Sequence, residues 1–126
     1  SGNISGGNLS VSGTVNLGNV QLNQYQETVY SVGSVSGTIT PDFNNGSIQK
    51  LTLTGNITLN SLANAVAGRS MTLILTQDGT GGHTLSTTMK FSDGYSTLSV
   101  PAGAIDIISV FYDGSTYYAT LTVGYA

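Results

Sequence analysis

The apolar residues of the chain are spaced two apart over most of its length, which is the period of β-strands. Near the C-terminus, Ala104–Tyr112 is almost entirely apolar, as in a strand buried on both faces, whereas Thr116–Val123 alternates apolar and polar residues. Asp113-Gly114-Ser115 joins the two runs, and Asp-Gly is a strong hairpin signal because glycine supplies the positive φ of a tight turn. The pattern predicts a hairpin at the centre of a β-sheet.

Shorter apolar runs precede this hairpin, with turn residues about every eight to twelve positions. The predicted strands cover residues 28–35, 36–40, 47–53, 57–59, 70–77, 83–87, 89–91 and 98–100. Residues 47–53 and 57–59 are expected to pair around the turn Thr54-Gly55-Asn56, and residues 61–68 are the one stretch with helical propensity, at most two turns. The fold class predicted for residues 25–126 is therefore all-β, an antiparallel β-sandwich of jelly-roll type.

Residues 1–24 follow a different pattern. Three apolar doublets, Leu9/Val11, Val15/Leu17 and Val20/Leu22, are separated by Ser, Asn, Gly, Thr and Gln. They recur too closely for a full strand-turn-strand unit and suit very short strands that wind around an axis. Because so slim a segment cannot bury its own apolar residues, we predict a repetitive β stem or arm that wraps with two identical copies in a threefold arrangement. A flexible linker is the alternative.

Charge is scarce: three basic residues stand against six acidic ones, and only 7% of residues are charged, where about 25% is typical. Three scattered cations cannot form a phosphate-binding stripe, so nucleic acid is not expected as a partner. No apolar run reaches membrane-spanning length, so no membrane insertion is expected. With no cysteine, disulfides, thiolate metal sites and thiol catalysis are excluded. This composition suits an extracellular or virion-surface β-protein.

The chain offers little catalytic chemistry. The one histidine, His83, lies in a glycine-rich turn without a nucleophile motif, and one histidine cannot make a zinc site. Most aspartates lie in turn strings, where Asp bonds nearby backbone N–H groups. Asp106 differs, because it interrupts an apolar strand and must be paired there, by a cation or by backbone donors. We expect no catalytic residue, no metal and no cofactor.

Aromatic residues near turn aspartates are the remaining candidates for ligand binding. Tyr95, Tyr117 and Tyr118 could stack on sugar rings, and Asp93 and Asp113 could accept hydrogen bonds from sugar hydroxyls. Packing in the core or at a subunit interface is the alternative role of these tyrosines. A host surface glycan is the ligand that the five residues suggest.

Several strings resemble a module that recurs in bacteriophage virion proteins. They are T-G-N-I-T-L at residues 54–59, T-L-I-L-T-Q-D-G-T-G-G at residues 72–82, A-I-D at residues 104–106 and Y-D-G-S-T-Y-Y at residues 112–118. The resemblance covers roughly residues 38–121. It implies a phage tail-fibre or related appendage domain, often trimeric, and it brings no catalytic residue with it.

The leading hypothesis is therefore a structural protein of the phage virion: a homotrimeric tail-fibre or receptor-binding domain that joins other virion proteins and binds the host surface without catalysis. One alternative is a capsid decoration protein on the exterior of the head, with residues 1–22 as an arm. Another, of a different class, is a glycan-degrading enzyme of the tailspike type that uses paired turn aspartates.

Overall fold

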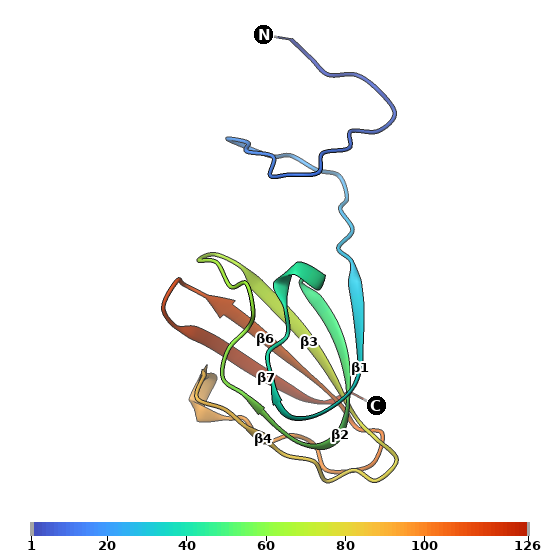
Figure 1. The fold of residues 1–126 in the computed structure, drawn as a ribbon, viewed down its shortest axis with the longest axis vertical. Coiled ribbons are helices and arrows are strands. Elements are labelled where there is room, and N and C mark those ends of the chain that lie inside the picture. The colour runs from blue at the N-terminus through green and yellow to red at the C-terminus, as the bar shows by residue number, and fades with distance from the viewer. Residues whose placement is uncertain (1, 126) are drawn as a thin grey trace.

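Seven strands form one sheet in the computed structural model, which describes residues 2–125 (Figure 1). They are β1 (Val29–Ile39), β2 (Ile48–Leu59), β3 (Ser70–Gln77), β4 (Leu85–Ser86), β5 (Lys90–Phe91), β6 (Ile105–Tyr112) and β7 (Tyr117–Tyr125). Two 3-10 turns, η1 (Phe43–Asn45) and η2 (Ser92–Gly94), complete the elements. The strand order is β1-β2-β3-β6-β7-β5, and β4 pairs with β2. The prediction of an all-β fold is confirmed.

The sheet is mixed, so the prediction of a wholly antiparallel arrangement is wrong for its first half. β1, β2 and β3 run parallel, and β3, β6 and β7 are antiparallel neighbours that include the predicted hairpin. The parallel ladder also departs from a jelly roll, whose strands are antiparallel. The physical reason lies in the connections 40–47 and 60–69, which cross over the sheet instead of closing hairpins. They bond to each other through Phe43 N to Ala63 O and Ala63 N to Pro41 O.

β2 is one strand where two were predicted. Its first half pairs with β3 and its second half, from Ile57, pairs with β4. Gly55 lies between the halves, and a Cβ there would come within 3.0 Å of the Ser36 Cβ on β1. Glycine thus serves the close approach of two strands and not a turn. The second half of β2 bends away from β3, so that β4, which pairs with it, lies at the front of the knob in Figure 1.

Two further predictions about local structure are wrong. The two strands predicted within residues 28–40 are one strand, β1, because register shifts next to the glycines at 33 and 37, with φ of 91° and 71°, interrupt its ladder without ending it. Residues 61–68 do not form a helix. Their backbone N–H groups donate to distant residues: Leu62 N donates to the Tyr117 hydroxyl, and Gly68 N donates to Tyr112 O. Tertiary bonding overrides the local propensity there.

The core lies on one face of the sheet. Alternate residues of β2, β3 and β6 point into it, and the crossovers and residues 82–100 cover it from the other side. The buried apolar side chains are Phe43, Leu51, Leu53, Ile57, Leu59, Leu62, Met71, Leu73, Leu75, Met89, Phe91, Leu98, Ile108, Val110 and Ala119. Three buried polar side chains, Gln49, Gln77 and Asp106, share the inward positions of the same strands.

We call residues 2–28 the stem segment and the rest of the described chain the knob. The stem segment contains no strand, and it extends away from the knob at the start of β1 (Figure 1). All of its residues are exposed in the single chain, including the apolar doublets, whose side chains are 49–69% accessible. The predicted winding into short strands with other copies, and the predicted boundary between residues 24 and 25, stay predictions.

The turn after β3 gives a sharp test of this fold. Gly81 is buried with φ of 72°, and a Cβ there would lie 2.6 Å from Ala102 N and 2.7 Å from Val100 O. A left-handed backbone alone costs an alanine about 1–2 kcal/mol, and the backbone clash adds to it. We expect Gly81→Ala to lower the free energy of unfolding by more than about 2 kcal/mol, measured by urea denaturation.

Gly79→Ala is the matched control, because a Cβ at Gly79 meets nothing within 4 Å and its φ is not positive. Its effect should stay within about 0.5 kcal/mol. Equal stability of the two variants would contradict the packing of this turn against residues 100–102.

Candidate functional site

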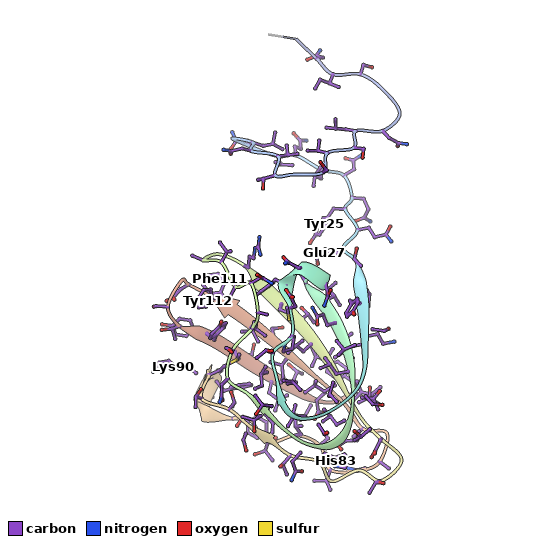
Figure 2. The ribbon with its side chains drawn as sticks, in the orientation of Figure 1. Tyr25, Glu27, His83, Lys90, Phe111 and Tyr112 are labelled. Carbon is purple, nitrogen blue, oxygen red and sulfur yellow. The ribbon has the colours of Figure 1, made fainter. Side chains whose placement is uncertain are left out.

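The end of the knob opposite the stem segment is built from loops. Figure 2 shows Tyr25 and Glu27 where the stem segment joins the knob, and His83 at the other end. We call this region, residues 78–87 and 95–104, the distal end. A shallow depression of about 220 Å³ there is lined by Gly82, His83, Thr84, Leu85, Ser96, Thr97, Leu98 and Val100.

The Asp78–His83 turn at the distal end is fixed by its own hydrogen bonds. Asp78 Oδ1 accepts from Thr80 N at 3.0 Å and Gly81 N at 3.1 Å, and it lies 2.9 Å from His83 Nε2. The Gly81 N–H, followed by the His83 side chain, holds the pKa of Asp78 below its ordinary value. The lone histidine is thus a member of a rigid turn, and its carboxylate partner stabilises that turn.

Asp106 and Gln77 hold the second loop of the distal end. Asp106 accepts hydrogen bonds from Ser99 N at 2.7 Å, Ser99 Oγ at 2.8 Å and Gly124 N at 3.0 Å. Gln77 Nε2 donates to His83 O and to Ser99 O. Of the two partners considered for Asp106, backbone donors are correct, and no cation contacts it among the described residues.

Two of the five predicted glycan contacts have structural roles. The Tyr117 ring stacks on Tyr112 with centroids 4.5 Å apart, and its hydroxyl lies 3.3 Å from both Leu62 N and Leu62 O. Asp113 Oδ1 accepts from Thr116 N at 2.7 Å and Ser115 N at 2.8 Å, so it caps the β6–β7 turn. The period of two could have shown from the sequence that Tyr117 points into the core and Tyr118 does not, because Tyr117 has the same phase as Ala119.

The other three predicted residues lie on β7, in η2 and directly after η2. Tyr118 is 47% exposed and pairs with Lys90 across the β5–β7 ladder. Together with Phe91, Ser92, Ala119 and Thr120 these two residues line an open depression of about 320 Å³. η2 packs against β7, so Asp93 lies near this depression, and Tyr95, 48% exposed, follows directly. We call Asp93, Tyr95 and Tyr118 with Lys90 the β5–β7 surface; Lys90 was not predicted from the sequence.

Neither the distal end nor the β5–β7 surface contains a group of side chains that could bind a metal ion. Among residues 2–125, no three His, Asp or Glu side chains are grouped so that they could hold an ion. The part of the chain that the structure describes also has no helix long and apolar enough to span a membrane. What the arrangement offers is a set of exposed aromatic, hydroxyl and charged groups on rigid strands, which is suited to contact with a polar surface.

An all-β knob at the end of an exposed, repetitive stem is the architecture of a fibre-like appendage. A family model described as "Putative phage tail fibre C-terminal domain" matches residues 39–117, more than half of the chain. The chain therefore belongs to this family of phage tail fibre domains. It is a structural component of a phage tail appendage, and its place is the virion tail. The comparisons with curated proteins and with solved structures gave no match.

The turn aspartates predict how stability depends on pH. Hydrogen bonds lower the pKa of three carboxyls below 3.8: Asn64 first for Asp42, Gly81 N for Asp78 and Thr116 N for Asp113. Because these folded-state pKa values are depressed, the stability they contribute is present above about pH 3.8 and is lost as the pH falls through the lowered values. We expect the melting temperature to fall as the pH is lowered from 5 to 2.

Asp113→Asn keeps an acceptor oxygen for Thr116 N but removes the titration, so it should reduce the acid-induced fall in melting temperature. Asp93→Asn is the control, because the Asp93 carboxylate accepts no hydrogen bond among the bonds of the described residues, and it should leave the fall unchanged. An identical fall in the Asp113→Asn protein would contradict this assignment.

Proposed function

We propose that three copies of the chain form one tail-fibre tip, joined through their stem segments, and that the knobs bind a host surface glycan without cleaving it. The single observation that carries the proposal is the contrast within one chain. The knob buries fifteen apolar residues in a complete core, whereas every apolar residue of the stem segment stands exposed.

The stem segment supports association of identical copies. Within each doublet the apolar residues are two apart, so over residues 9–17 they share one side of an extended segment, and the doublet Val20/Leu22 has the opposite phase. A single such segment has nothing to bury this side against, as the exposure of Val15 and Leu17 shows. Burial between copies would remove it from water, at roughly 25 cal/mol per Å² of apolar surface. Threefold association fits a narrow stem that leads into one knob per copy.

The β5–β7 surface supports glycan contact. Tyr118 lines the depression and Tyr95 directly follows η2, and both are about half exposed, while Asp93 and Lys90 add a hydrogen-bond acceptor and a donor. An open depression of this kind makes only weak contacts with one sugar. Three copies on one stem would bind a polymeric surface together, and the linked sites would raise the overall affinity far above that of one.

The geometry favours binding over the two alternatives. The family match supports the tail and gives no support to a place on the capsid exterior. An enzyme of the tailspike type would need two free carboxylates facing one substrate. Asp42, Asp78 and Asp113 are each bonded to backbone N–H groups of their own turns, so their local role is structural.

The first test of this function is the mass of the assembly in solution. Light scattering of the full chain should give three times the 12.9 kDa of one chain. Val15→Ser with Leu17→Ser removes apolar surface from the stem segment and should shift the mass to that of one chain. Asn16→Ser, between them, is the control and should leave the trimer intact. A full chain that stays monomeric at high concentration would contradict the proposal.

The second test concerns the glycan. Tyr118→Ala should weaken retention on immobilised bacterial surface polysaccharides by roughly fivefold or more, about 1 kcal/mol or more for one aromatic contact. Tyr125→Ala is the control, since Tyr125 is 45% exposed, almost as much as Tyr118, but lies away from the β5–β7 surface. Equal retention of both variants, or release of shortened glycan by the unmodified protein, would rule out this mode of binding.

A further inference from the structure

The outward face of β2, β3 and β6 is left uncovered in the single chain. Both crossovers and residues 82–100 place their buried side chains, among them Phe43, Leu62 and Leu98, on the inward face. The opposite face presents the alternate residues of the same strands. We define the outer sheet face by Ile48, Lys50, Thr52, Thr72, Ile74, Thr76, Ile107 and Ser109, which the register places on adjacent rungs.

The composition of this face is unusual for a surface in contact with water. Ile74 pairs with Ile107 across the centre of the face, and both are only half-buried. Around them stand hydroxyl side chains, and the β3 and β6 positions of the face carry no charge. An antiparallel sheet with one solvated face normally alternates apolar and polar residues. β6 instead has mainly apolar residues on both sides, which is typical of a strand whose two faces are both covered.

The outer sheet face has no acidic group. The chain has five aspartates and one glutamate. The aspartates lie in turns or, for Asp106, point inward, and Glu27 lies in the stem segment. The one charge on the β2 rungs is Lys50, which has no ion-pair partner among the described residues. Lys50 pairs with Ile74, so the face carries one cation beside its centre and no other charge. A low content of charged residues is a mark of protein–protein interfaces.

The occupant follows from where the stem segment enters. It joins the knob at β1, and Val29, 54% exposed, pairs with Ile48 at the corner of the outer sheet face. Stem segments that wrap together bring their Val29 residues close to a common axis, so this corner must lie next to the neighbouring copies. The β5–β7 surface begins on β7, where Thr120 pairs with Ser109, so the packing between copies has to end at β6 for that surface to stay free.

We propose that the outer sheet face packs against the other copies of this chain, so that the knobs as well as the stems hold the trimer together. The inference rests on the proposed trimer and adds the surface that the knobs use. Hydroxyl and aliphatic side chains suit it, because symmetry brings like residues near one another and a hydroxyl can both donate and accept.

The absence of cysteine allows a clean test with single cysteines in the full chain. Ser109→Cys places a thiol on the outer sheet face, and Ser86→Cys places one on β4, which pairs with the other half of β2. Both serines are exposed strand residues in the single chain, so they form a matched pair. The measurement is the rate of maleimide modification of each protein in the assembled state.

We expect modification at position 109 to be at least roughly tenfold slower than at position 86, because it would require local opening of the interface. Adding Val15→Ser and Leu17→Ser, which should leave single chains, should restore fast modification at position 109. Equal rates in a protein that light scattering shows to be trimeric would overturn the inference and leave the trimer standing. A monomeric full chain would overturn both.

Discussion

The knob depends on a solution to one constraint: irregular backbone lies over its core, and the polar groups of that backbone need partners. Three buried side chains supply many of them. Gln49 Nε2 donates to Asp42 O and Gly46 O in the first crossover. Gln77 binds both loops of the distal end through His83 and Ser99, and Asp106 accepts from Ser99 and Gly124. All three take inward positions on strands, so the sheet itself holds the loops in place.

The sequence allowed the strands to be predicted better than their pairing. The period of two located β3, β6 and β7 and the hairpin between the last two, because an Asp-Gly turn closes a hairpin through local chemistry. The connections around Pro41 and Leu62 also contain turn residues, yet they cross the sheet. What decides between a hairpin and a crossover is a set of distant bonds, such as Phe43 N to Ala63 O, which no local pattern contains.

The same distinction explains the candidate site. Tyr117 and Tyr118 are neighbours with equal intrinsic chemistry, and only the phase of β7 turns one toward Leu62 and the other to solvent. That phase could have been read from the sequence. The turn roles of Asp113 and Asp78 were predictable as well, because Asp in a glycine-containing turn bonds the N–H groups just after it. The contribution of Lys90 was not, since it comes from a two-residue strand that tertiary pairing defines.

The position of β1 at the edge of the sheet bears on whether separate copies aggregate through their strands. β1 is an eleven-residue strand at the edge of the sheet, with a free row of backbone N–H and C=O groups. Such an edge can recruit further strands without limit. The irregularities next to Gly33 and Gly37 break the straight run of these groups twice, because the register with β2 shifts at each. β1 has the extra residue, Val32, at the first shift, and β2 has the extra residues, 54–56, opposite Ser36 at the second. A second copy that approaches this edge therefore meets two interruptions instead of one straight row of pairing groups, which disfavours edge-to-edge aggregation of the knobs.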